Sequence, residues 1–280
     1  MTAPLLGTPS ATELHVMTLN IRRDLGALAW PRADRWETRR PRLTALLRTE
    51  RPDLLGMQEA LPTQAAAVSA ALGPSFRRVG HGRLPGPRGE GCPLFYDADR
   101  LELRTWRQIA LSRTPDRPGS RSWLSVAPRV AVEASFRDRR TGAPVTVLNT
   151  HLDAFSPWAR LPQAQAVHDL AVASATPVIL LADVNAAAGS APWRALEADG
   201  VLRDSWTAAV SRRTPAWSTF AGYRSPRRGR RIDGILVSPT LSVRRVGIDA
   251  RQYGGGWPSD HLPVHALIDL APAAAPEEPA

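Results

Sequence analysis

The sequence predicts a mixed α and β fold in which layered β-sheets carry helices on their outer faces. Two kinds of segment lead to this prediction: short apolar runs rich in β-branched residues, and longer segments with helical spacing. The two kinds do not alternate strictly, and the last strands follow each other through loops. A purely parallel barrel is therefore disfavoured relative to layered sheets.

Seven short apolar runs, each bounded by Pro or polar residues, predict buried strands. They are LHVMTLNI (14–21), PDLLGMQ (52–58), PLFYD (93–97), PVTVLNT (144–150), PVILLAD (177–183), IDGILVS (232–238) and PVHALIDL (263–270). Helical spacing occurs in residues 39–50, 61–72, 159–174 and 190–200, the last ending at Gly200. GRLPGPRGEG (82–91) is rich in Gly and Pro, which predicts a flexible loop.

The chain is long enough to form one large domain. It has 280 residues, 43% of them hydrophobic and 22% charged, an ordinary globular composition that excludes wholesale disorder. No sequence repeat recurs at a period of roughly 20–50 residues, which excludes solenoids and propellers. We expect a loose lead-in over residues 1–12, a single domain over residues 13–270, and a disordered tail over residues 271–280.

The chain is strongly basic, with 36 Lys plus Arg against 26 Asp plus Glu and a formal net charge of +10. All of the cationic side chains are Arg, which together with the richness in Ala and Pro is typical of a GC-rich codon bias. Codon bias therefore accounts for part of the charge, and a basic surface also raises the encounter rate with anions.

The sequence carries few signals for an oxidising or membrane environment. Cys92 is the only cysteine, so neither an intrachain disulfide nor a Cys-rich zinc site can form. The start of the chain lacks the pattern of a secretory leader, and no apolar run is long enough to be a transmembrane segment. We expect a soluble, cytoplasmic protein.

Polar residues stand at the ends of the predicted strands. Those that close or follow a strand are Asn20, Glu59, His151, Asp183 and Asn185, and those that precede a strand are Asp233, Asp260 and His261. If the strands of the second group are antiparallel to those of the first, all eight residues gather at one edge of the sheets.

Each of these residues alone has an ordinary structural explanation, such as a turn former or a helix cap. Together they supply what metal-assisted hydrolysis of a phosphate ester needs. The ester is anionic, so a hard divalent cation held by carboxylate and amide oxygens must neutralise it, and Glu59 is the first expected ligand. A carboxylate must take a proton from water, while Asn185 and His261 stabilise the phosphorus centre.

The sequence resembles the endonuclease/exonuclease/phosphatase superfamily, which includes deoxyribonuclease I, apurinic endonucleases, sphingomyelinases and inositol polyphosphate 5-phosphatases. The resemblance covers about residues 14–270, and its strongest part is Asp-x-Asn followed far downstream by Ser-Asp-His. Its stretches are VMTLNIRR (16–23), GMQEA (56–60), NTHLD (149–153), LLADVNAAAGSAPW (180–193), RRIDGILVS (230–238) and PSDHLPV (258–264). RTPDRPGSRSW (113–123) and QYGGGWPSDHLPV (252–264) resemble a bacterial branch of metal-dependent hydrolases.

This resemblance implies a four-layer α/β/β/α sandwich of two mixed sheets flanked by helices. It also implies a phosphoesterase site at one edge of the sandwich that depends on Mg²⁺ or Mn²⁺. By motif, Asn20 and Glu59 would lie at the metal, with Asp260 as a further ligand.

The remaining residues of the motif would carry out the chemistry. The resemblance implies that Asp183 orients and deprotonates the attacking water. Asn185 and His151 would bind the scissile phosphate. His261, held by Asp233, would stabilise the transition state, and no covalent intermediate is expected.

Three features depart from the motif or lie beside it. Similar proteins often carry His-Phe-Asp-His where this chain reads His-Leu-Asp-Ala, which leaves the role of Asp153 open, and that of Glu90 is open too. The loop RSPRRGRRID (224–233) precedes Asp233. We expect its arginines Arg227, Arg228 and Arg231 to bind an anionic part of the substrate beyond the scissile group.

The sequence thus predicts a hydrolase that cleaves a phosphodiester or phosphomonoester by in-line attack of water. Its expected partner is an anionic phosphoester, and nucleic acid, a sugar or inositol phosphate and a phospholipid headgroup remain open as substrates. No obligate protein partner is evident. The alternative, a non-catalytic nucleic-acid-binding protein on the same scaffold, predicts gaps in the set of site residues, and there are none. A two-metal calcineurin-type enzyme would need Asp-x-His and Gly-Asn-His-Asp segments, which the sequence lacks.

Overall fold

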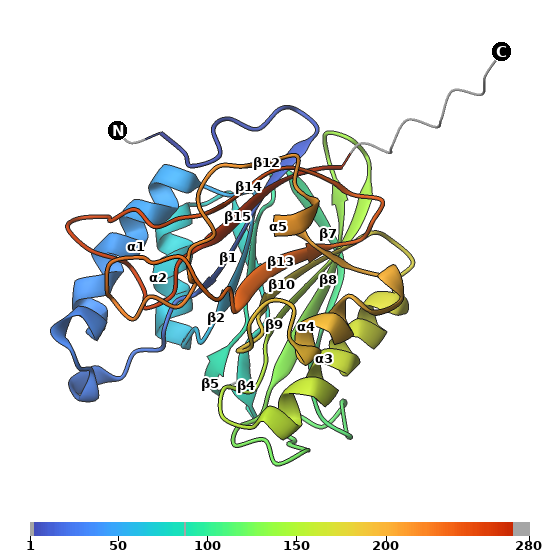
Figure 1. The fold of residues 1–280 in the computed structure, drawn as a ribbon, viewed down its shortest axis with the longest axis horizontal. Coiled ribbons are helices and arrows are strands. Elements are labelled where there is room, and N and C mark those ends of the chain that lie inside the picture. The colour runs from blue at the N-terminus through green and yellow to red at the C-terminus, as the bar shows by residue number, and fades with distance from the viewer. Residues whose placement is uncertain (1–2, 87, 271–280) are drawn as a thin grey trace.

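Two large β-sheets pack against each other, and helices cover both outer faces (Figure 1). The computed structural model describes residues 3–86 and 88–270, so the tail predicted over residues 271–280 lies outside the described residues. The two mixed sheets and their flanking helices confirm the predicted four-layer sandwich.

The first sheet has seven strands in the order β12-β14-β15-β1-β2-β6-β3. Their bounds are β12 (Ser211–Arg212), β14 (Ser242–Ile248), β15 (Val264–Asp269), β1 (Glu13–Asn20), β2 (Leu54–Gln58), β6 (Leu94–Asp97) and β3 (Phe76–Val79). Strand β1 is parallel to β2 and antiparallel to β15. Helices α1 (Trp36–Glu50) and α2 (Pro62–Leu72) cover the outer face of this sheet.

The second sheet has six strands in the order β11-β13-β10-β9-β8-β7. Their bounds are β11 (Arg203–Asp204), β13 (Asp233–Val237), β10 (Val178–Asp183), β9 (Pro144–His151), β8 (Val130–Asp138) and β7 (Leu101–Ala110). Helices α3 (Pro157–Val172) and α4 (Ala191–Leu196) cover its outer face.

Shorter elements complete the fold. They are the hairpin of β4 (Gly82–Leu84) and β5 (Arg88–Gly91), the short helix α5 (Ser205–Ala208), and 3-10 turns at Gly26–Leu28, Arg32–Asp34 and Ala198–Gly200. None of the helices in the described part of the chain is long and apolar enough to cross a membrane.

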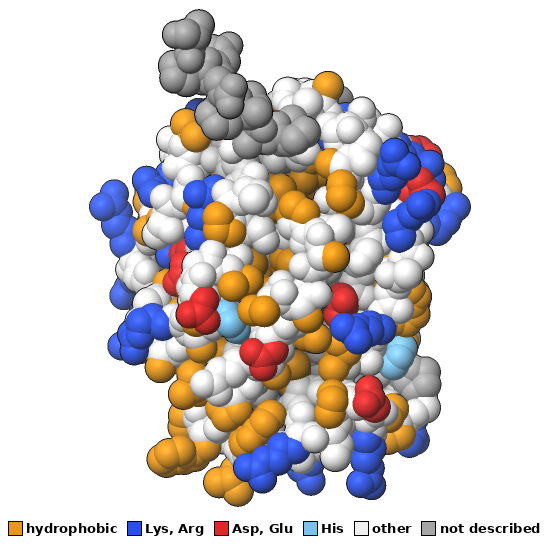
Figure 2. Space-filling view, turned by 90° about the vertical axis from the view of Figure 1, so that its right-hand side faces the viewer, with side chains coloured by type: hydrophobic (Ala, Val, Ile, Leu, Met, Phe, Trp, Pro, Cys, Tyr) orange, Lys and Arg blue, Asp and Glu red, His pale blue; other side chains and the backbone are white. Residues whose placement is uncertain are grey.

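The positive charge is spread over the surface. Figure 2 shows arginine side chains around the margin of one face, with acidic side chains between them. Ion pairs take up part of this charge, for example Arg107 with Glu133 at 2.8 Å. This face carries no single large basic patch of the kind that binds nucleic acid.

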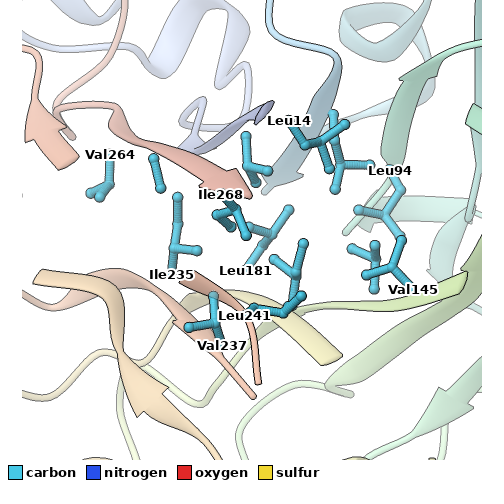
Figure 3. Packing of buried hydrophobic residues seen from close by; sticks show 14 of the residues in the cluster. Leu14, Leu94, Val145, Leu181, Ile235, Val237, Leu241, Val264 and Ile268 are labelled. Carbon is cyan, nitrogen blue, oxygen red and sulfur yellow. The ribbon is translucent and has the colours of Figure 1, made fainter. Parts of the chain in front are cut away.

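The main core lies between the two sheets. Figure 3 shows side chains of both sheets, among them Ile268 and Leu181, packed together in this layer. The sheets approach so closely at Gly56 that a Cβ atom there would lie 2.6 Å from Cδ1 of Leu181. Two further apolar clusters bury the inner faces of α1 and α2 on one side and of α3 and α4 on the other.

All seven predicted strands form, with bounds that differ by at most two residues from those predicted. The predicted helical segments also form, but the last one is interrupted. Helix α4 ends at Leu196, and a 3-10 turn follows in which Asp199 has a φ of 54°. Glu197, at the end of α4, instead accepts a hydrogen bond from the backbone N–H of Asp204 at 3.0 Å.

Strands β7, β8 and β14 were not among the predicted runs. Strand β7 is an exposed edge strand with many polar residues, and β14 is interrupted by Arg244 and Arg245 and carries a bulge. The segment 82–91, predicted as a flexible loop, forms the hairpin β4–β5, in which Arg83 and Glu90 form an ion pair at 2.6 Å. The prediction of a loop was wrong for residues 82–84 and 88–91, because strand pairing and the ion pair hold these two strands together.

The start of the described chain is packed against the domain. Leu6 is buried, the backbone N–H of Leu5 donates to the carboxylate of Glu50 at 3.1 Å, and Arg245 donates to the carbonyl of Leu6 at 2.7 Å. Residues 5–8 therefore differ from the loose lead-in predicted from composition, because two charged side chains of the domain bind their backbone.

Candidate active site

The strand register brings the predicted residues together at one edge of the sheets. Strands β9 and β10 are parallel and place His151 beside Asp183, while β10 and β13 are antiparallel and place Asp183 beside Asp233. On the other sheet, Asn20 pairs with Gln58, the residue before Glu59. The predicted antiparallel arrangement is confirmed.

These residues surround a cleft of about 570 Å³. Five of the eight predicted metal and catalytic residues line it, namely Glu59, His151, Asn185, Asp260 and His261. The other three, Asn20, Asp183 and Asp233, are buried and bind to those that line the cleft. The structure therefore places all eight predicted residues in one site.

Asn20 links the two sheets across the site. Its Nδ2 donates to Oε1 of Glu59 at 3.0 Å and to Oδ2 of Asp183 at 2.9 Å, while its Oδ1 accepts from the backbone N–H of Arg22 at 2.9 Å. A flipped amide would set an oxygen against two carboxylates, so this orientation is fixed by the network. Asn20 therefore fixes the carboxylates of Glu59 and Asp183 relative to each other.

Glu59 is held in its ionised form. It has a φ of 60°, which is uncommon for a residue with a long side chain and re-aims it after β2. Burial raises the pKa of Glu59, but hydrogen bonds from Asn20 and from the backbone N–H of Arg23 outweigh burial and lower it. The carboxylate can therefore serve as a metal ligand near neutral pH.

Asp183 is fully buried at the end of β10. Burial and the nearby charge of Asp233 raise the pKa of Asp183 to about 7, although hydrogen bonds from Asn20 and from the backbone N–H of Asn185 oppose them. Oδ2 of Asp183 lies 3.5 Å from Nε2 of His151. A carboxylate whose pKa is close to neutral is suited to accept a proton from water.

His261 and Asp233 form a buried pair. Nδ1 of His261 lies 2.9 Å and 3.1 Å from the two carboxylate oxygens of Asp233, whose backbone N–H donates to Oγ1 of Thr219 at 3.1 Å. Burial lowers the pKa of His261, but the charge and hydrogen bond of Asp233 outweigh burial and raise it to about 10. Since Nδ1 is bound to Asp233, Nε2 of an imidazolium is left to act in the cleft.

His151 and Asn185 both lie next to Asp183, His151 on the neighbouring strand β9 and Asn185 two residues further along the chain. Asn185 has a φ of 52°, a conformation that Asn tolerates, and its Nδ2 donates to the carbonyl of Leu152 at 3.1 Å. Burial lowers the pKa of His151 well below its ordinary value, and the charges of Arg129 and Arg83 lower it further. His151 is therefore a neutral hydrogen-bonding group.

The carboxylates that face the cleft fit a hard divalent cation. Glu59 and Asp260 both line it and supply the oxygen donors that Mg²⁺ and Mn²⁺ prefer. Burial raises the pKa of Asp260, and the negative charge of Glu59 adds to this effect, while His261 and Arg22 oppose it. A cation between two such carboxylates would relieve their mutual repulsion.

The sequence of residues 17–261 matches the model of a family described as the Endonuclease/Exonuclease/phosphatase family. The chain belongs to this family. It is accordingly a hydrolase that acts on phosphoester bonds. A comparison with curated proteins finds no significant match.

Solved structures agree with this assignment. A protein of the endonuclease/exonuclease/phosphatase family from Bacteroides thetaiotaomicron is 30% identical, with a TM-score of 0.84 over 93% of this chain and 95% of its own. A mannosyl-6-phosphatase from the same organism is 29% identical, with a TM-score of 0.84 over 91% of this chain and 99% of its own. The human Nocturnin catalytic domain with bound sulfate shares the fold at 20% identity and a TM-score of 0.68, over 93% and 96% of the two chains.

The predicted arginine loop does not join the family site. Arg231 instead donates to Asp204 at 2.6 Å, and its guanidinium lies 5.7 Å and 5.3 Å from the ring centroids of Trp193 and Trp206. Arg227 and Arg228 are exposed. None of the three is among the described residues that line the cleft. For Arg231 the prediction was wrong, because its side chain binds Asp204 and packs against the two Trp rings and does not line the cleft.

Other cationic residues line the cleft and were not predicted. They are Arg22, Arg23, Arg83 and Arg129. Arg22 and Arg23 follow Asn20 by two and three residues, so their position in VMTLNIRR was a usable signal. Arg83 and Arg129 lie outside every motif stretch, and only the tertiary structure brings them to the site.

The two residues with open roles are both ordered by partners. Asp153 is buried and accepts hydrogen bonds from Ser125 and from the backbone N–H groups of Phe155 and Ser156, so it organises the loop before α3. Glu90 lines the cleft and pairs with Arg83 at 2.6 Å and Arg23 at 3.3 Å. Neither contact requires a metal.

Proposed function

We propose that the chain hydrolyses a phosphoester by in-line attack of water, with Mg²⁺ or Mn²⁺ held by Glu59 and Asp260. The observation that carries this proposal is the placement of a buried carboxylate, Asp183, and a buried Asp233–His261 pair behind one cleft, with the pKa of both Asp183 and His261 raised. The pKa of Asp183 is raised to about 7 and that of His261 to about 10. Near neutral pH such a pair offers a proton acceptor and a cationic donor side by side.

The residues of the site would have different roles in the reaction, according to their protonation states. A bound divalent cation would neutralise the phosphoryl oxygens and stabilise developing negative charge. Asp183 would accept a proton from the attacking water, and Asn20 would keep its carboxylate aligned with that of Glu59. The hydrogen bonds from Nδ2 of Asn20 to the two carboxylates support this alignment.

The phosphoryl group would be held by neutral and cationic donors. His261, fixed by Asp233, would donate from Nε2 to a phosphoryl oxygen as charge builds up in the transition state. His151 at the end of β9 and Asn185 after β10 would bind the same group from the six-stranded sheet. Because their positions are fixed by the protein rather than by solvent, they need little reorganisation during the reaction.

A phosphorylated small molecule is the substrate that the comparisons support best. One of the similar structures, at 29% identity, is a mannosyl-6-phosphatase. The face shown in Figure 2 carries scattered rather than gathered arginines, which gives less support to a protein that binds nucleic acid without cleaving it.

An assay of metal dependence tests the proposal. The protein is stripped with EDTA and assayed with p-nitrophenyl phosphate, bis-p-nitrophenyl phosphate, mannose 6-phosphate and plasmid DNA, before and after Mg²⁺ or Mn²⁺ is added. We expect no turnover in EDTA and recovery with either cation. A Glu59→Gln variant should need much more cation for half-maximal rate, whereas Arg107→Ala, an exposed control outside the cleft, should match the wild type. Full activity in EDTA would refute the proposal.

A further inference from the structure

The inner end of the cleft contains a buried guanidinium with unused donors. Arg129 is only 4% exposed, yet it lines the cleft beside His151. Its Nε and Nη1 have no hydrogen-bond partner among the described residues. The carboxylate of Asp153 lies 3.9 Å from Nε, which is an ion pair without a hydrogen bond.

Two buried arginines outside the cleft differ in their pairing: Arg39 is fully paired, whereas Nη1 and Nη2 of Arg100 have no hydrogen-bond partner among the described residues. Arg39 is fully buried and donates to the backbone carbonyls of Asp34, Ile21 and Arg22 at 2.8, 2.6 and 3.0 Å. Leaving charged donors buried and unpaired is costly and rare in folded proteins. Arg129 differs from Arg100 because it lines the cleft, so an anionic ligand bound there would supply a partner for its charge.

The space in front of Arg129 is small. This inner end is lined by Glu59, Arg83, Glu90, Arg129 and His151, and its free volume is about 10 Å³. That is room for about one atom of the size of a water oxygen. An oxygen atom bound there must therefore be a terminal atom of the ligand, because the space has no room for a carbon substituent on it.

We propose that this inner end is an anion subsite that receives one oxygen of a terminal phosphate, which makes phosphomonoesters the substrate class. This inference rests on the proposed function of the cleft. A monoester has three non-bridging oxygens, one for the cation at Glu59, one for His151 and Asn185, and one for Arg129. In a diester the third oxygen is a bridging ester oxygen bonded to carbon; it carries no charge for the guanidinium, and the attached carbon does not fit the space.

Charge and shape favour the same orientation of the substrate. A phosphomonoester carries nearly two negative charges at neutral pH. The inner end offers it two guanidinium groups, because Arg83 pairs with Glu90 and Arg129 lies near Asp153, while the carboxylate of Glu59 would bind the cation. The mouth of the cleft is instead apolar, with Phe155 and Phe220 lining it at 74% and 51% exposure. The phosphate would enter first, and the alcohol would stay at the mouth.

Phosphate binding tests the subsite without relying on catalysis. Titration calorimetry with inorganic phosphate and with dimethyl phosphate is carried out on wild type, Arg129→Met, Arg129→Lys and Arg107→Ala, with Mg²⁺ and in EDTA. We expect Arg129→Met to weaken phosphate binding by about 10- to 100-fold and Arg129→Lys to weaken it less. Dimethyl phosphate binding should change little, and Arg107→Ala, which removes the same charge from the surface, should behave as wild type.

Steady-state kinetics on a monoester and a diester test the proposed subsite separately from the proposed phosphoesterase function. Wild type should prefer p-nitrophenyl phosphate to the bis ester, and Arg129→Met should lose on the order of 10- to 100-fold in kcat/KM for the monoester but little for the diester. Equal losses on both esters, or unchanged phosphate affinity in folded Arg129→Met and Arg129→Lys, would overturn the subsite. If wild type cleaves neither ester with any cation, the proposed function fails, and the calorimetry alone decides the subsite.

Discussion

Two buried groups in this protein each bring three metal-ligand side chains within 4.8 Å of one another. One is Asp183, Asp233 and His261 at the cleft. The other is His15, Glu50 and His265, which involves the opposite end of β1 and a pocket of about 290 Å³ near the start of the chain. By residue type and burial alone the two groups look equally suited to chemistry.

Their partners make the difference. The carboxylate of Glu50 is already bound by the backbone N–H of Leu5 and by Arg251, so it holds the start of the chain in place. Burial lowers the pKa of both His15 and His265, and Nε2 of His15 lies 3.1 Å from Nδ1 of His265. In the cleft, by contrast, Asp233 keeps His261 charged. Proximity of ligand-type residues therefore does not define a site, and the protonation that their partners impose does.

The sharpest test of this contrast is one substitution in each group. Asp183→Asn removes the proton acceptor and keeps the shape of the side chain, so kcat should fall on the order of 10²–10⁴-fold. His15→Gln in the second group should leave kcat within about 2-fold, since it touches nothing in the cleft. Steady-state kinetics on both variants measure the two effects. A large loss of kcat in His15→Gln would show that the second group also serves catalysis.

The next effect concerns the charge of His261. In Asp233→Asn the hydrogen-bonded anionic partner is lost and only the charges of Asp183 and Asp260 still oppose burial, so the pKa of His261 should fall from about 10 to below 8. At pH 8 the ring would then be neutral, and kcat should fall about 10²-fold. NMR titration of the histidine ring gives the pKa directly. A His261 that stays charged at pH 8 in this variant would refute the role given to Asp233.

The two groups should also respond to pH with opposite signs. Asp183 has a raised pKa, so its contribution to stability is present below about 3.8 and is lost as the pH rises through about 7. His15 and His265 have lowered pKa values, so their contribution is present above about 6.5 and is lost as the pH falls.

Denaturant unfolding of the metal-free protein between pH 5 and 7 separates these contributions. Relative to wild type, Asp183→Asn should make stability rise more steeply with pH, and His15→Gln should make it rise less, each by up to about 1 kcal/mol per pH unit. Slopes that shift in the same direction would contradict the assignment of the two groups.

The smallest expected effect is at the mouth of the cleft. Phe155→Ala removes an exposed apolar contact for the alcohol part of the substrate, so KM should rise about 3- to 10-fold while kcat stays the same. Trp158→Ala, an exposed aromatic residue that does not line the cleft, is the matched control. Equal changes in the two variants would mean that the apolar mouth contributes nothing specific.

The fold was predictable where burial is complete. Runs such as PVILLAD are apolar on both faces because sheet and helices cover β10 from both sides, and the sequence alone indicates a strand there. Strand β7 was missed because it is an exposed edge, where polar residues are tolerated and no apolar run marks the strand.

The site was predictable to the extent that it lies at strand ends. Asp183 and His151 were predicted because each closes or follows an apolar run, and the strand register places them side by side. Arg129 was not predicted as a site residue, because its burial at the cleft and its unpaired donors are visible only in the tertiary structure. Arg231 was predicted at the site because it is close to Asp233 in sequence. The sequence does not show that its side chain instead donates a hydrogen bond to Asp204.

Anomalous diffraction from crystals grown with Mn²⁺ and inorganic phosphate tests the central claim most directly. The account predicts one manganese peak within coordination distance of carboxylate oxygens of Glu59 and Asp260, and none between His15, Glu50 and His265. Manganese bound in the second group, with none at Glu59, would contradict it.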